Sequence, residues 1–305
     1  MLYFQYFVLF VVMSPTFPPI WATSVKFSDH TFDGWMAEFP VTTEKMQSIL
    51  DKINSESGKN DVKFTLPPLG LMPDNTYVIS IAYGKVTYPS LEKVITPELK
   101  EKYSTEHDVL HFSFPFLNSE KDPNLRLKFM YITFTGTDDP YVEPNVVMPH
   151  LHADQLHVET TEEGIVKMSF VYDDLTLNMT GKISGKCHKP PDRTVEVLDE
   201  YVRELTISHI PVDLSVCEDL ACIDLQYCKV ARQYGSEIKA AGTNVCQFWT
   251  STSSIRRCSS TFHIDYISND LKEFIGLDDD VVDSIESESF KGLLVDISLR
   301  FPCVE

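Results

Sequence analysis

The stretch Gln155–Gly185, QLHVETTEEGIVKMSFVYDDLTLNMTGKISG, has the most regular pattern in the chain. A β-strand points successive side chains to opposite faces, so strict alternation of apolar and polar residues predicts strands with one apolar face. The break at Asp173–Asp174 is either a turn between two strands or a bulge in a single strand. The residues of the predicted apolar face are Val166, Met168, Phe170, Leu175, Leu177 and Met179.

Further strands are predicted on both sides of this stretch, in residues 62–66, 77–83, 109–114 and 261–267, and with similar alternation in 125–135 and 295–301. In 125–135 the second parity also becomes apolar, so we expect both faces of that strand to be covered. Residues 23–40 are aromatic but irregular, which favours an edge strand or a tucked arm.

Fewer segments show the apolar spacing of a helix than the pattern of a strand. Met46, Ile49, Leu50 and Ile53 lie on one side of a helix that Thr42 or Thr43 can cap. Residues 269–274 and 278–288 are also predicted to be helical. We therefore predict an α+β, β-dominated fold, with long antiparallel curved sheets packed against a few amphipathic helices.

Residues 1–22 contain no charged side chain and no histidine. An apolar run followed by prolines and the small Ala22 predicts a secretory signal peptide, and therefore a secreted chain. The alternative is a signal-anchored membrane protein, since about 20 apolar residues can span a bilayer. Pro15, Pro18 and Pro19 argue against that anchor, because proline interrupts the helix.

The chain has seven cysteines, all in its second half: Cys187, Cys217, Cys222, Cys228, Cys246, Cys258 and Cys303. None has the CxxC spacing of zinc ribbons, so in an exported chain we expect disulfide bonds and one leftover thiol. Their distribution divides the mature chain into a cysteine-free β-rich half, 23–186, and a disulfide-stapled α+β half, 187–305. The two halves can also form one continuous domain.

The 305 residues include 26 basic and 45 acidic side chains, a formal charge of −19. This charge opposes nucleic-acid binding, which needs positive charge against phosphates. Asn178-Met179-Thr180 is an acceptor sequence for N-linked glycosylation. Because Asn178 has the opposite parity to Leu177 and Met179, the strand prediction directs it away from the apolar face.

One short motif has the residues of a metal site. His150-x-His152-x-Asp154 resembles the zinc loop of the metallo-β-lactamase superfamily, in which such residues hold metal that activates water. Gln155 stands where that family has a further histidine, and no later ligand has a matching signature. A degenerate zinc hydrolase is thus one alternative function. No serine or cysteine nucleophile motif is present, and no cofactor is predicted.

The stretch 164–181 also resembles the tubular lipid-binding superfamily, which includes the bactericidal/permeability-increasing and lipopolysaccharide-binding proteins. Those exported proteins show a glycine, two alternating strands around a turn and a second glycine, here Gly164 and Gly181. The resemblance implies a long curved sheet around a helix, with an apolar slot for acyl chains.

The leading hypothesis from the sequence is therefore a secreted, non-enzymatic binding protein for a lipid or other hydrophobic small molecule. The six apolar residues of 166–179 would face that ligand. An extracellular protein-protein interaction module is the second hypothesis.

Overall fold

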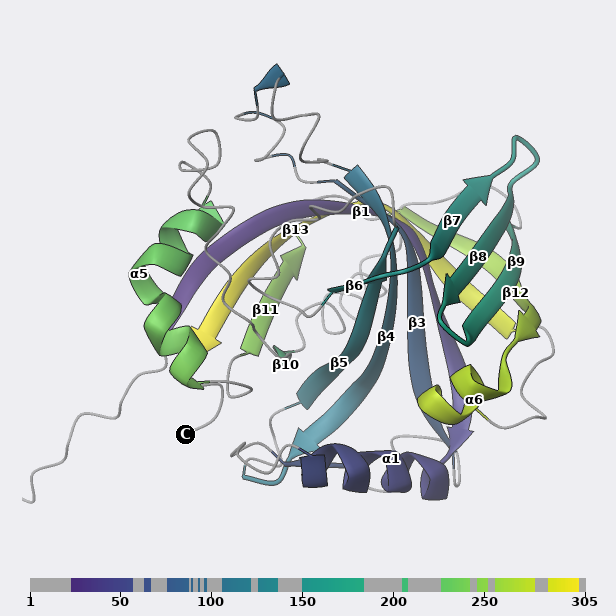
Figure 1. The fold of residues 1–305 in the computed structure, drawn as a ribbon. Helices are drawn as coiled ribbons and strands as arrows, with labels where there is room; N and C mark the ends of the chain where they lie inside the picture. The colour runs from purple at the N-terminus through teal and green to yellow at the C-terminus, as the bar shows by residue number, and fades with distance from the viewer. Residues whose placement is uncertain are drawn as a thin grey trace, which may run out of the picture.

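A computed structural model describes residues 23–56, 63–66, 76–87, 106–121, 126–136, 150–183, 205–207, 226–241, 246–251, 256–277 and 285–301, together with the single residues 89, 93, 96 and 97. Strands dominate these residues, and the predicted α+β, β-rich class is confirmed (Figure 1). The strands are β1 (Thr23–Thr42), β2 (Phe64–Thr65), β3 (Thr76–Thr87), β4 (Glu106–Ser119), β5 (Arg126–Thr135), β6 (His150–His152), β7 (Gln155–Thr160), β8 (Ile165–Tyr172), β9 (Leu175–Ile183), β10 (Leu205–Ile207), β11 (Cys246–Ser251), β12 (Arg256–Ile267) and β13 (Ile285–Phe301). The helices are α1 (Thr43–Glu56), α5 (Gln226–Ala241) and α6 (Asn269–Ile275).

All these strands belong to one strongly curved sheet. Its order is β1-β3-β4-β5-β10-β11-β13-β12-β9-β8-β7, and an additional pairing of β1 with β13 closes the first seven strands into a ring. Strands β12, β9, β8 and β7 continue the sheet from β13 outside this ring, as Figure 1 shows, while β2 pairs with β4 and β6 pairs with β5. Strands from both sides of residue 186, the predicted boundary between the two halves of the chain, pair with one another in three places: β1–β13, β9–β12 and β5–β10.

Strand β1 is not the edge strand or arm that its sequence suggested. Between Thr31 and Met36 it pairs with β13 on one side and with β3 on the other. Gly34 lies opposite Gly84 in this doubly paired segment, and a side chain on either glycine would collide with the backbone of the other strand. The two glycines thus allow the close contact between β1 and β3.

The hairpin predicted at Gln155–Gly185 forms as β8 and β9, and Asp173–Asp174 is the turn between them. Asp173 has a φ of 47°, in the left-handed region that Asn and Asp tolerate better than most residues. The carboxylate of Asp154 accepts a hydrogen bond of 2.9 Å from the Asp173 backbone N–H.

One continuous apolar core lies between β1, β3, β4, β5, β8, β9 and β12, and α1 and α6 close one end of it (Figure 1). The predicted stripe of α1 packs into this core, with Met46 and Leu50 fully buried. Thr42 Oγ1 caps the helix by accepting from the Lys45 N–H at 3.3 Å. Helix α6 is capped by Ser268 and ends at Gly276, whose φ of 75° suits glycine. The β-strand from Ile285 contradicts the helix predicted over 278–288, of which 278–284 lie outside the described residues.

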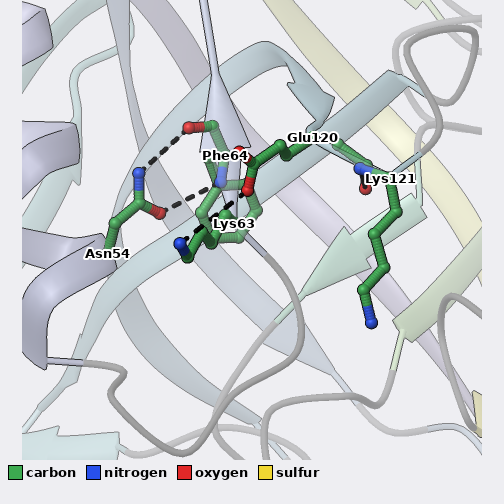
Figure 2. Close-up of polar contacts among 6 residues, drawn as sticks. Asn54, Lys63, Phe64, Glu120 and Lys121 are labelled. Atoms are coloured by element: carbon green, nitrogen blue, oxygen red, sulfur yellow. Dashed lines mark hydrogen bonds and ion pairs between the residues drawn. The ribbon is translucent and has the colours of Figure 1, made fainter.

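The side chain of Asn54 in α1 is hydrogen-bonded to the short strand β2. Asn54 donates to the Phe64 carbonyl and accepts from the Phe64 N–H, each at 3.0 Å, so its amide replaces a neighbouring strand (Figure 2). Beside it, the Glu120 N–H donates to the Lys63 carbonyl at 2.9 Å, and the two side chains form an exposed ion pair at 4.0 Å. These contacts join α1, β2 and β4 at the closed end of the core.

Several sequence predictions lie outside the described residues. Residues 1–22 are among them, so the signal peptide stays a prediction. Cys187, Cys217, Cys222 and Cys303 are also outside, and the side chains of Cys228, Cys246 and Cys258 are not described. In the described part of the chain, no helix combines the length and the apolar character needed to cross a bilayer.

Candidate functional site

The sheet formed by β3, β4 and β5 is buried on both faces, and the two faces differ in chemistry. One face carries Tyr83, Leu110, Phe112 and Phe134 and belongs to the apolar core. The opposite parity carries a buried hydrophilic set, which we call the polar face: Ser80, His107, His111, Ser113, Lys128, Thr133 and Thr135. Burying polar groups costs free energy unless they are paired, and clusters of buried polar and ionisable residues are frequent at functional sites.

Strand register places these residues next to one another. Ser80 pairs with Ser113, and His111 pairs with Thr133. The ring Nδ1 of His111 lies 2.8 Å from Thr133 Oγ1, a distance typical of a good hydrogen bond. This bond fixes the imidazole of a buried histidine, which leaves Nε2 as its second polar atom.

Lys128 is the buried cation of the polar face. It lies in β5 between Leu127 and Phe129, which face the core, and only 7% of its surface is exposed. Every other lysine whose burial the structure describes is exposed or half-buried. Lysine side chains are almost never buried to this extent unless their charge is paired. A lysine withdrawn from water is also the amine that proteins use for Schiff-base chemistry.

The proposed zinc ligands are used in separate contacts. His152 is exposed, and its Nδ1 lies 3.4 Å from Thr135 Oγ1 at the rim of the polar face. Asp154 is bonded to the hairpin turn at Asp173, and His150 pairs with Thr133 through the strand register. Within the described ranges, no three His, Cys, Asp or Glu residues are grouped as metal ligands would be.

The residues predicted to face a ligand lie in the packed core. Val166, Met168, Phe170, Leu177 and Met179 are at most 2% exposed, and Leu175 is partly buried against the same cluster. The Phe170 ring, for example, lies 4.6 Å from that of Phe134, centroid to centroid. Packing against the rest of the sheet therefore explains their alternation without a ligand.

A second polar group lies on the core side, where β4 approaches β7. Burial raises the pKa of Asp108, although Lys85, His157 and a hydrogen bond from the Val158 backbone all oppose the shift. Burial also raises the pKa of Tyr83 well above its usual value. Asp108 Oδ1 and the Tyr83 hydroxyl are buried, and neither has a hydrogen-bond partner among the atoms that the structure describes.

The sequence pattern alone did not identify Lys128. Its signal was a lysine inside the strand Arg126–Thr135, between the apolar residues Leu127 and Phe129. The strand prediction used only the apolar residues of this segment, and the polar partners on β3 and β4 come from segments that only the register brings together.

The sequence matches no family model and no curated protein. In arrangement, the chain is similar to solved structures of acetoacetate decarboxylase-like proteins. An acetoacetate decarboxylase from Legionella pneumophila subsp. pneumophila str. Philadelphia 1 is 12% identical with a TM-score of 0.43, over 90% of this chain and 84% of that chain. An acetoacetate decarboxylase-like enzyme from Sphingomonas wittichii RW1 is 8% identical with a TM-score of 0.43, over 90% and 91%. A structure from structural studies of acetoacetate decarboxylase is 6% identical with a TM-score of 0.40, over 95% and 91%.

These comparisons correct three sequence-based predictions. The resemblance to the tubular lipid-binding superfamily is wrong, because the similar solved structures are acetoacetate decarboxylase-like. The hypothesis of a non-enzymatic binding protein and the prediction that the chain is not an enzyme are contradicted by the same finding. The physical reason is that any hairpin of a curved sheet with one buried face shows the alternation of 164–181. A small-molecule partner is compatible with the names of these neighbours.

Proposed function

We propose that the chain is an enzyme that converts a small carbonyl compound, with the Lys128 amine as its nucleophile. The observation that carries the proposal is the burial of Lys128, at 7% exposure, on the polar face of β5. Exposed lysines are hydrated by bulk water, whereas a buried lysine is withdrawn from it, which is the setting in which proteins use lysine as a nucleophile.

The chemistry follows from the amine. Its nitrogen lone pair attacks the carbonyl carbon, a C–N bond forms, and the carbonyl oxygen leaves as water. Once its nitrogen is protonated, the imine withdraws electrons from the neighbouring carbon more strongly than the carbonyl did, which makes bonds at that carbon easier to break. Hydrolysis of the imine regenerates the lysine amine and releases the product.

Another residue of the polar face can serve this reaction. Ser113 pairs with Met130, two residues along β5 from Lys128, and its hydroxyl can orient a polar substrate. We assign Ser113 to substrate binding and the covalent step to Lys128.

Acetoacetate is a suitable first probe, because it is a small keto acid and the neighbours' names refer to it. The assignment of Lys128 depends on its burial and not on that similarity. We also propose that the chain is secreted, since residues 1–22 have the composition of a signal peptide.

Trapping with borohydride tests the proposal. The reductant converts an imine into a stable secondary amine, so acetoacetate plus borohydride should leave an adduct on the peptide that contains Lys128. Lys128→Arg should abolish that adduct, whereas Lys85→Arg, which removes a half-exposed lysine of an ion pair, should leave it unchanged. Equal labelling of Lys128 and exposed lysines such as Lys63 would refute the assigned role.

A further inference from the structure

The outward face of the β8–β9–β12 sheet carries the glycosylation acceptor sequence. Asn178 is in β9 between the buried residues Leu177 and Met179, so its side chain projects from the face opposite the core. It is partly exposed, and Thr180, two residues along, lies on the same face. The strand geometry therefore leaves room at Asn178 for a group attached to its side-chain amide.

An exposed aromatic side chain lies next to this position. Tyr266 of β12 is 54% exposed, the one large hydrophobic residue with this exposure in the described part of the chain. The register pairs it with Asn178, so the two residues are cross-strand neighbours. Side chains of such neighbours are close enough to interact.

A bulge in β12 turns Tyr266 outward. The register with β9 shifts between Ile264 and Tyr266, which keeps Ile264 and Ile267 in the core and sends both Asp265 and Tyr266 to the outer face. Bulges of this kind re-aim side chains. The Asp265 carboxylate accepts a hydrogen bond of 2.5 Å from Thr180 Oγ1, which further fixes the two strands at this point.

We propose that Asn178 carries an N-linked glycan and that the first sugar of this glycan stacks on the ring of Tyr266. The apolar face of a pyranose matches the flat ring of tyrosine, and the phenol hydroxyl stays in water. In the attachment step, the Asn178 amide nitrogen replaces the pyrophosphate of a lipid-linked oligosaccharide donor. A C–N bond forms at the anomeric carbon, the C–O bond to phosphate breaks, and the amide proton leaves with the pyrophosphate.

The proposal requires export of the chain but is independent of Lys128, which lies in β5. It is tested with the full chain produced in insect cells and analysed by glycopeptide mass spectrometry. The expected result is a glycan on Asn178 that disappears in Thr180→Ala and persists in Thr180→Ser, since serine also completes the acceptor sequence. An unmodified Asn178 in the wild-type chain would overturn the inference.

The stacking is tested by the rate at which an endoglycosidase releases the glycan from the native protein. Tyr266→Ser should accelerate release about two- to tenfold, as expected for loss of one ring contact. His263→Ser is the matched control, because His263 is exposed on the same face of β12 but pairs with Thr180. Equal rates in wild type and Tyr266→Ser would show that the sugar does not rest on this ring.

Discussion

Substitution of Gly181 by alanine should destabilise the protein strongly, although it adds a single methyl group. A Cβ at Gly181 would lie 2.7 Å from Cδ1 and 2.9 Å from Cζ of Phe262, and closer still to Cε1. Phe262 cannot retreat, because it is 1% exposed and meets the rings of Trp35 and Tyr83 edge-on at 5.2 and 5.6 Å between centroids. Overpacking of a rigid core costs about 1–3 kcal/mol, and the fixed ring places Gly181→Ala at the upper end, about 3 kcal/mol.

The assay is equilibrium unfolding in urea, with stability taken from the midpoint at constant slope. Gly136→Ala is the matched control, since its new Cβ would have one neighbour, the Leu156 carbonyl oxygen at 3.8 Å. That variant should change stability by less than about 0.5 kcal/mol. Adding Phe262→Leu to Gly181→Ala should recover at least about 1 kcal/mol relative to additivity. A loss below about 1 kcal/mol for Gly181→Ala would contradict the tight packing of Phe262 against β9.

Three further predictions concern polar groups. Asn54→Ala should lower the free energy of unfolding by about 1–3 kcal/mol and speed hydrogen exchange of the Phe64 amide. The control Gln47→Ala, which removes an exposed side-chain hydrogen bond to Asp51, should lower it by less than about 0.5 kcal/mol. Thr133→Val should cost about 1–2 kcal/mol by urea unfolding, because His111 loses its 2.8 Å partner, and Thr133→Ser should retain most of that stability. Burial raises the pKa of Asp108 in the folded state, so the folded protein binds the carboxyl proton more tightly than the unfolded chain does. The free energy of unfolding should therefore fall as pH rises from the ordinary carboxyl pKa through the raised one. Asp108→Asn should remove this part of the slope and stabilise the protein at neutral pH; an unchanged pH profile of the unfolding free energy would count against the stated cause.

The spacing of apolar residues in the sequence predicted the helices and strands whose apolar faces follow a regular period. The alternation at 166–179 predicted β8 and β9, and the stripe from Met46 to Ile53 predicted α1. The prediction for β1 was wrong because, in its doubly paired segment, both neighbours are distant in sequence, β3 and the C-terminal β13. Its bulges near Ser28 and Gly34 also disturb the period-two signal.

The candidate site was harder to predict than the strands. Lys128 is a polar residue on a parity that is otherwise apolar later in the strand, and its neighbours in sequence do not show that a lysine at this position is buried. The histidine motif at 150–154 had the residue types of a zinc loop, but β6 and the turn at Asp173 take His152 and Asp154 into different contacts. Residue types at the spacing of a zinc loop were therefore not enough to predict a metal site, because the strand register decides which side chains meet.

Spectroscopic titration with 2,4-pentanedione tests the reactivity of Lys128 most directly. This diketone condenses with an amine to a conjugated enamine that absorbs in the near ultraviolet, so the absorbance counts reactive lysines. We expect one equivalent of enamine per chain for the wild type and for Lys85→Arg, and no enamine for Lys128→Arg. Absence of the enamine in the folded wild-type protein, or an equal signal in Lys128→Arg, would contradict the role assigned to this lysine.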